Sequence, residues 1–340
     1  MRKKVVGFGE ILLRLSPPGY LKLIQTDTLT ANYTGAEANT LVSLRKFGYD
    51  ACFVTKVPDN EVADCAMATM RKYGVDVSKV IYGGERLGTY YSEKGASQRP
   101  SKVLYDRKYS SISTATPENF CWDDILDGAD AFLFTGITAA LGSALPEICL
   151  EACRTAKRKG IKVFCDLNYR KKLWPEDRAQ QVMRGLMSYV DVVMGNEEDS
   201  EKVLGIAPAH GDVVNGLSEQ DYEEVAKKIS DNFGAKRVAF TLRTSISASE
   251  NIWNGMIWED GNACFSRPYK MNIVDRMGGG DSFGAGVIYS TLEDFDAQHS
   301  VDFAVAASCL KHSIELDFNL SSLEDVYQLM AGDGSGRIQR

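Results

Sequence analysis

The residues best suited to chemistry in this chain are three glycines followed by an acid, Gly278-Gly279-Gly280-Asp281. Consecutive glycines allow positive φ angles and leave the backbone N–H groups uncovered by side chains. The stretch from Ser282 to Leu292 has a helical pattern. The first N–H groups of a helix lack intrahelical partners and favour an anion. The segment therefore predicts a cradle for phosphoryl oxygens with a carboxylate beside it.

A carboxylate in this place repels a resting phosphate, but it becomes useful if it accepts a proton from an attacking hydroxyl during phosphoryl transfer. The alternative is that Asp281 only caps the helix, which is a common role of aspartate. Gly284 and Gly286 lie inside the expected helix. Each costs ~1 kcal/mol relative to alanine there, so a close approach of backbone or ligand is expected at both. The segment matches neither GxxxxGK[ST] nor GxGxxG, so it does not indicate a P-loop or a dinucleotide site.

Most of the chain alternates β-prone and helical segments, which predicts an α/β fold with a mainly parallel sheet covered by helices on both faces. Short apolar runs indicate the strands, and amphipathic stretches indicate the helices. Strands are expected at 5–9, 51–55, 131–135, 161–165, 190–194 and 237–241, with a β-meander over 244–266. Helices are expected at 36–47, 61–73, 143–159, 176–189, 219–232, 281–292 and 298–313.

The alternation breaks at residues 86–110, where the β-prone runs Thr89–Tyr91 and Val103–Tyr105 follow each other without a helix between them. A hairpin that projects from the main sheet is the simplest interpretation. Together with the segment around 11–33, it is expected to form a small β-sheet lid on a single domain that spans residues 1–340. An open sheet face on such a lid also suggests a homo-oligomer, either a dimer or a larger assembly.

Composition and charge argue against several classes of protein. The 340 residues carry a formal net charge of -7, which argues against nucleic acid or an anionic membrane as the main partner. No stretch approaches the ~18 apolar residues needed to cross a bilayer. The eight cysteines form no CxxC pair and the three histidines stand in no HExxH motif. Buried, free thiols in a cytoplasmic protein are therefore expected, with no zinc site indicated. Residues 207–217 are expected to form a surface insertion and 332–340 a polar tail.

The glycine segment resembles the C-terminal signature of the ribokinase-like (PfkB) carbohydrate kinases, Asp-Thr-x-Gly-Ala-Gly-Asp-x-Phe. Arg276 and Met277 replace Thr-x, and Gly279 replaces Ala. The likeness covers nearly the whole chain. Its other segments are Gly35–Asn39, similar to the substrate loop, Asp166–Arg170, similar to Asp-x-Asn-x-Arg, Asn196–Asp199, similar to Asn-x-x-Glu, and Thr241–Arg243, similar to Thr-Leu-Gly.

The resemblance implies a ribokinase-like fold, ATP and Mg²⁺ as cofactors, and Asp281 as the catalytic base. It also implies an anion hole at Gly278, Gly279 and Gly280. The residues that would contact the sugar are Gly35, Ala36, Glu37, Ala38, Asn39, Tyr90, Tyr105, Arg107, Arg170, Asp281 and Asp317. Those that would contact ATP are Asn168, Arg170, Asn196, Thr241, Arg243, Gly278, Gly280 and His312. Asn196 and Asp199 would hold Mg²⁺ through water.

Within the family, the chain is most similar to the kinases of 2-keto-3-deoxygluconate, through segments such as Gly9-Glu10, Arg14-Leu15 and Tyr105-Asp106-Arg107. This implies transfer of the ATP γ-phosphoryl group to the C6 hydroxyl of that sugar acid. The chemistry agrees, because the Arg107 guanidinium is a fork suited to a carboxylate. Three alternatives stay open: Arg107 is a surface residue paired with Asp106, the substrate is a neutral sugar such as fructose or ribose, or the chain is a non-catalytic sugar or nucleotide sensor on the same fold.

Overall fold

The computed structural model describes residues 2–210, 217–332 and 334. The expected insertion at 207–217 and the expected tail at 332–340 therefore lie largely outside the described residues. None of the described helices is long and apolar enough to cross a membrane. All eight cysteines are free thiols, but the prediction that they are buried is wrong for Cys65 and Cys121, which are exposed.

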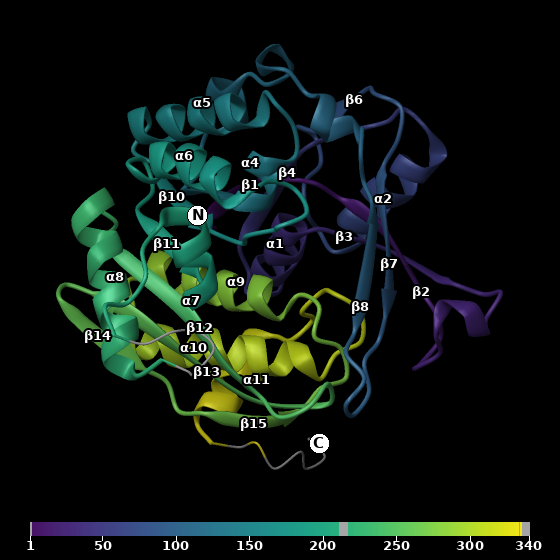
Figure 1. The fold of residues 1–340 in the computed structure, drawn as a ribbon. Coiled ribbons are helices and arrows are strands. Elements are labelled where there is room, and N and C mark those ends of the chain that lie inside the picture. Colours follow the sequence, from purple (N-terminus) through teal and green to yellow (C-terminus); the bar gives the residue numbers. More distant parts are fainter. Residues whose placement is uncertain (1, 211–216, 333, 335–340) are drawn as a thin grey trace.

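A nine-stranded sheet runs through the molecule in the order β14-β13-β12-β11-β10-β9-β1-β4, with β15 paired to β13 (Figure 1). Neighbours from β4 to β12 are parallel, and β13 to β15 are added antiparallel. This confirms the predicted mainly parallel sheet. The strands are β1 Lys4–Phe8, β4 Asp50–Val54, β9 Ala131–Thr135, β10 Lys162–Asp166, β11 Val192–Gly195, β12 Arg237–Ser245, β13 Glu250–Glu259, β14 Asn262–Phe265 and β15 Tyr269–Asn272.

Helices cover both faces of this sheet, because successive strand residues point to opposite sides. Val6 and Phe132 pack toward one group of helices, α3, α4, α5, α6 and α8, whereas Val5 and Leu133 pack toward the other, α1, α2, α9, α10 and α11. The helices are α1 Ala36–Lys46, α2 Glu61–Lys72, α3 Trp122–Ile125, α4 Gly136–Ala140, α5 Leu145–Arg158, α6 Glu176–Met187, α7 Glu197–Asp199, α8 Glu219–Phe233, α9 Gly279–Leu292, α10 Ala297–His312 and α11 Leu323–Met330. Shorter turns are η1 Leu23–Gln25, η2 Ser111–Thr114, η3 Pro117–Asn119 and η4 Ser200–Leu204.

A separate four-stranded sheet, called the small sheet below, stands beside the main body in Figure 1. Its order is β3-β2-β7-β8, with β2 and β7 parallel and the outer pairs antiparallel. The strands are β2 Leu12–Ser16, β3 Thr30–Thr34, β7 Gly88–Glu93 and β8 Lys102–Asp106. A further short pair joins β5 Lys56–Val57 to β6 Ile81–Tyr82. Whether the small sheet moves as a lid stays a prediction.

Helix α9 begins earlier than the sequence suggested. Its first residue is Gly279, and Gly278 is the N-cap residue with φ 80° and ψ 0°. Asp281 therefore lies inside the first turn, and the alternative that it is the N-cap is wrong. The Ser308 hydroxyl donates to the Gly279 carbonyl at 2.7 Å, so a contact from α10 supports a helix start that glycine alone disfavours.

Candidate active site

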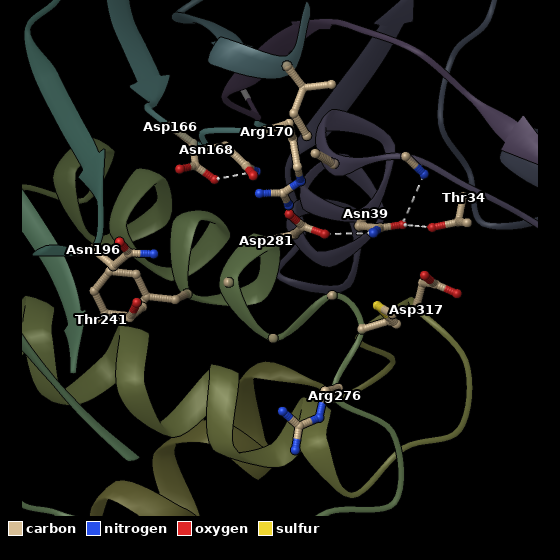
Figure 2. A pocket seen from close by; sticks show the side chains of 18 of the residues that line it. Thr34, Asn39, Asp166, Asn168, Arg170, Asn196, Thr241, Arg276, Asp281 and Asp317 are labelled. Carbon is tan, nitrogen blue, oxygen red and sulfur yellow. Dashed lines mark hydrogen bonds between the residues drawn. The ribbon is translucent and has the colours of Figure 1, made fainter. Parts of the chain in front are cut away.

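A cavity of about 360 Å³ lies where the carboxyl ends of β10, β11 and β12 meet the N-termini of α1 and α9 and one side of the small sheet (Figure 2). This volume lies within the usual range of small-molecule sites. All the residues named from the sequence as site residues line it, except one. The exception is Ala38, whose methyl group is fully buried in the core beneath α1. Ala38 therefore supports the wall from behind.

Each of the three positions in the turn is occupied by glycine for a different structural reason. Gly278 has a positive φ, and a Cβ there would sit 1.9 Å from the backbone oxygen of Asp317. A Cβ on Gly279 would meet the His312 ring at 2.4 Å. A Cβ on Gly280 would meet nothing within 4 Å, because this residue is exposed to the cavity. The turn thus lies at the N-terminus of a 14-residue helix, which is a suitable place for an anion. The Gly279 N–H also makes a long contact, 3.4 Å, with the Arg276 carbonyl oxygen.

Asp281 projects from the first turn of α9 toward the cavity. Its Oδ2 atom accepts a hydrogen bond from the Asn39 Nδ2 at 2.6 Å (Figure 2). Burial raises the pKa of Asp281 to about 7, although the Asn39 hydrogen bond and the nearby Arg170 charge oppose the shift. Figure 2 shows Arg170 extending toward this carboxylate. A carboxylate that titrates near neutrality is suited to accept a proton.

The orientation of Asn39 is determined by its neighbours. Its Oδ1 accepts from the Thr34 hydroxyl at 2.8 Å, so its amide nitrogen is the group that faces Asp281. Glu37, two residues earlier on α1, is buried and its Oε1 accepts from the Thr138 hydroxyl at 2.6 Å. Burial raises the pKa of Glu37. Thus the N-terminus of α1 and that of α9 are joined directly at the candidate base.

Three polar residues at or after the carboxyl ends of β10 and β11 line the cavity: Asp166, Asn168 and Asp199. The Asn168 amide donates to Asp166 at 3.1 Å, and Asn168 adopts a φ of 36°, which is unusual for a residue other than glycine. Burial, with the Asp199 and Asp281 charges, raises the pKa of Asp166 well above its usual range. Burial likewise raises the pKa of Asp199 to about 6. A cation near these carboxylates would relieve their mutual repulsion.

The two residues expected to hold Mg²⁺ already have local partners. The Asn196 Oδ1 accepts from the backbone N–H of Asp199 at 2.9 Å, and the Asp199 Oδ1 accepts from the backbone N–H of Tyr169 at 2.8 Å. Within the described part of the chain, no group of three or more His, Cys, Asp or Glu side chains is arranged to hold a metal. These donors fit a Mg²⁺ ion that is bound mainly by substrate phosphates and water.

Arg107 is not the surface residue of the first alternative. Its partner is Glu10, and Asp106 pairs instead with Arg86 on the outside of the small sheet. The side chains of Arg107 and Glu10 are 9% and 3% exposed, and Gly88 packs beside them where a Cβ would lie 2.8 Å from the Glu10 Oε1. Arg107 Nε and Glu10 Oε1 are both buried without a partner. Both residues also line the cavity.

Tyr90 and Asp317 contact each other across the cavity wall. The Tyr90 hydroxyl donates to the Asp317 Oδ1 at 3.0 Å, and the Asn32 amide donates to the Oδ2 at 3.1 Å. Arg14 donates to the same Oδ2 at 2.7 Å. The Tyr105 ring lies 5.7 Å from that of Tyr90, centroid to centroid. The small sheet thus presents two aromatic rings to the cavity, with one hydroxyl already engaged.

Three arginines give the other half of the cavity its positive charge. Arg170 donates to the backbone oxygen of Tyr169 at 2.8 Å, and Arg276 to that of Ala248 at 2.9 Å. Arg243 is exposed at the end of β12. Burial and the nearby Arg243 charge lower the pKa of Arg276. In the described part of the chain none of the three is ion-paired to a carboxylate, so their charges are available to an anion.

His312 closes the cavity behind Gly279. It is buried, its Nδ1 lies 2.8 Å from the Ser308 carbonyl oxygen, and its ring centroid is 4.9 Å from that of Trp253. Burial lowers the pKa of His312 to about 4. The ring is therefore neutral at physiological pH and contributes packing and polarity without charge.

Several cavity residues were not among the predicted site residues: Glu10, Asp166, Asn251, Trp253 and Arg276. Glu10, Asp166 and Arg276 appeared only inside segments of family likeness, and Arg276 appeared as a departure from the signature. Asn251 and Trp253 lie in a β-prone stretch in which packing is the expected role. Their position on the cavity depends on the pairing of β13 with β12, which sequence alone does not specify.

Comparison with known proteins shows that the chain is a phosphotransferase of the sugar kinase class, and the fold and the cavity are consistent with this class. Residues 2–313 match the pfkB family carbohydrate kinases, so the chain belongs to this family and is a carbohydrate kinase. The structure of a 2-dehydro-3-deoxygluconokinase from Thermotoga maritima is 49% identical, covers 98% of this chain and 99% of its own, and superimposes with a TM-score of 0.94. The ribokinase-like fold is thereby confirmed.

Two curated relatives are more distant but extend over most of the chain. A 2-dehydro-3-deoxygalactonokinase from Haloferax volcanii is 28% identical over 337 residues, which is 99% of each chain. A 2-dehydro-3-deoxygluconokinase from Thermoproteus tenax is 27% identical over 312 residues, or 90% of this chain and 87% of its own. The family match and these relatives therefore favour an enzyme over the alternative of a sensor without kinase activity.

Proposed function

We propose that this kinase transfers the γ-phosphoryl group of ATP to the C6 hydroxyl of 2-keto-3-deoxygluconate, the compound also called 2-dehydro-3-deoxygluconate. The observation that carries the proposal is the convergence of Asp281, the glycine turn and the Arg107 guanidinium on one cavity. Support for the substrate comes from the similar proteins of Thermotoga maritima and Thermoproteus tenax, both of which are 2-dehydro-3-deoxygluconokinases. That the protein is a carbohydrate kinase follows already from the family match.

Asp281 acts as the base in this proposal. Ionised Asp281 takes the proton of the sugar hydroxyl as the oxygen attacks the γ-phosphorus, and the bond from that phosphorus to the leaving ADP oxygen breaks. The Asn39 amide holds the receiving carboxylate in place at 2.6 Å. The N–H groups of Gly279 and Gly280 lie at the start of α9, where they stabilise the negative charge of the moving phosphoryl group.

The nucleotide occupies the half of the cavity that carries Thr241, Arg243 and His312. Arg243 and Arg276 meet the phosphates, because guanidinium groups without a carboxylate partner favour that anion. Asn168 and Asn196 lie on the same wall. Bound Mg²⁺, held through water near Asn196 and Asp199, supplies charge neutralisation of the phosphates.

The sugar acid occupies the half bounded by Gly35, Ala36 and the small sheet. Its carboxylate binds Arg107, whose Nε is buried and unpartnered beside Glu10. Arg170 adds a second positive charge between the two halves. A neutral sugar can offer hydroxyl oxygens to these guanidinium groups but no negative charge, so it forms weaker hydrogen bonds than a carboxylate does.

A substrate panel tests the proposal. At fixed ATP, we expect kcat/KM for 2-keto-3-deoxygluconate to exceed that for fructose and ribose by at least ~100-fold. The galactonate epimer is included because of the relative from Haloferax volcanii. Arg107→Ala is expected to raise the sugar-acid KM by roughly 10- to 100-fold, as for loss of a charge-assisted hydrogen bond. Arg86→Ala, on the outer side of the small sheet, serves as the control with unchanged KM. Preference for a neutral sugar contradicts the proposal.

A further inference from the structure

Arg14 makes the most extensive set of buried polar contacts among the cations of the small sheet, yet it does not line the cavity. It lies on β2 and its side chain is 1% exposed. Its Nη1 donates to Asp317 at 2.7 Å and its Nη2 donates to Asp275 at 2.9 Å, while its Nε donates to the Ser16 hydroxyl at 2.9 Å. One guanidinium therefore binds two buried carboxylates that come from distant parts of the chain.

Both of these carboxylate residues touch the glycine turn. The backbone oxygen of Asp317 packs against Gly278, so closely that a Cβ there would lie 1.9 Å away. Asp275 uses its other oxygen, Oδ1, to accept from the backbone N–H of Met277 at 3.1 Å. Arg14 thus holds the turn from two sides, once through each acid. Displacement of either acid would move the backbone that carries the anion-binding N–H groups.

Neither of the two lysines near Arg14 could replace it as the link between Asp275 and Asp317. Lys311 is also buried, and its Nζ donates to the backbone oxygen of Asp275 at 3.3 Å and to that of Ile314 at 3.2 Å. The Lys94 Nζ lies 4.0 Å from the Asp275 carboxylate but binds Glu315. Neither lysine bridges Asp275 and Asp317. Among the residues that the structure describes, Arg14 alone forms ion pairs with both acids, through its planar fork.

We propose that Arg14 is a positioning residue that couples the small sheet to the anion hole. Through Asp275 and Asp317 it sets the place of the Gly278–Gly280 backbone relative to the wall that holds the sugar. This inference rests on the proposed phosphoryl transfer, because the readout is the rate of that step. A displacement of about 1 Å at a reacting centre can cost on the order of 100-fold in rate.

The test compares Arg14→Lys, Asp275→Asn and the double variant with the wild type. Lysine keeps the charge but lacks the fork, so kcat is expected to fall on the order of 100-fold, while KM for ATP changes less than about threefold. Asp275→Asn keeps an oxygen for the Met277 N–H and loses the ionic link, so kcat falls at least ~10-fold. The double variant is expected to be no slower than Arg14→Lys, because residues that act through one link are not additive.

Arg86→Lys is the matched control, since its ion pair with Asp106 is exposed on the same sheet, and its kcat is expected to match the wild type. Thermal unfolding shows whether each variant is folded. If Arg14→Lys folds and its kcat is within threefold of the wild type, the proposal is overturned. It is also overturned if the loss of kcat in the double variant equals the product of the losses in the two single variants. If Arg14→Lys does not fold, the test rests on Asp275→Asn. A normal kcat of that variant then overturns the proposal. All assays use the sugar that the wild type phosphorylates best, so a different preferred sugar overturns the proposed substrate alone.

Discussion

Asp281 shows at the scale of single residues how burial can prepare a candidate base. Its carboxylate would titrate near 4 in water, and burial raises its pKa to about 7. The hydrogen bond from Asn39 and the charge of Arg170 keep the shift from going further. A base that is half ionised at neutral pH combines a useful ionised fraction with a strong tendency to take a proton.

The pH dependence of the wild type and of Asp281→Asn tests this assignment. Because the active form is ionised, kcat/KM for the sugar is expected to rise about tenfold per pH unit below 7 and to level off above it. Asp281→Asn is expected to lose roughly 10²- to 10⁴-fold in kcat and to lose this pH dependence. Steady-state kinetics from pH 5 to 9 measure both. Near-normal turnover by the variant, with the sugar still bound, would show that Asp281 is not the base.

The sequence was sufficient to single out the glycine turn and Asp281, because they are neighbours in the chain, and the structure places them on one cavity. Their roles stay predictions. It did not predict which residues pair across long separations. Arg107 follows Asp106, which made an exposed pair plausible, yet its partner Glu10 is 97 residues away. Arg14 and its two acids are separated by 261 and 303 residues. Such contacts depend on topology, which local patterns do not contain.

At the scale of elements, helices α9 and α10 pack closely, and the glycines of α9 differ in their role. A Cβ on Gly286 would lie 2.5 Å from the Cα of Ala304 on α10, so this glycine permits backbone contact between the helices. A Cβ on Gly284 would meet only the Met194 sulfur at 3.5 Å. The expectation of a close approach at both glycines holds for Gly286 and is wrong for Gly284.

Alanine substitutions at these two positions form a matched pair. Gly286→Ala is expected to destabilise the protein by ~1–3 kcal/mol, because the helices must separate or bend. Gly284→Ala is expected to be neutral or to stabilise by ~0.4–1 kcal/mol, since alanine favours the helix and has room there. Denaturant or thermal unfolding measures both changes. Equal effects of the two substitutions would contradict the packing described for α9 and α10.

Element boundaries were less predictable than element types. The parallel strands and their intervening helices were expected from periodicity, whereas α9 begins at Gly279 in spite of the low helix propensity of glycine. The Ser308 hydroxyl and the packing of α10 hold this start, and neither is visible in a local window. The strand β12 likewise continues to Ser245 because β13 pairs with it over its whole length.

At the scale of the whole molecule, the site joins the large sheet, two helix N-termini and the small sheet. A ligand that binds across them stabilises the folded chain, by ~2.7 kcal/mol at a concentration 100 times its Kd. We therefore expect 2-keto-3-deoxygluconate with a non-hydrolysable ATP analogue to raise the Tm, whereas ribose with the same analogue adds nothing beyond the analogue alone. Differential scanning fluorimetry measures this. A larger shift with ribose than with the sugar acid would contradict the proposed substrate.

The link between Arg14 and its acids also bears on how the chain assembles as it is synthesised. Strands β2, β3 and β7 are complete within the first 93 residues. Their central cation has no carboxylate partner until Asp275 and Asp317 have been made. Burying an unpaired guanidinium costs several kcal/mol, so the inner face of β2 stays hydrated while most of the polypeptide is still emerging. We therefore expect docking of that face to be a late event, and the glycine turn that Asp275 and Asp317 contact to take its shape in the same step.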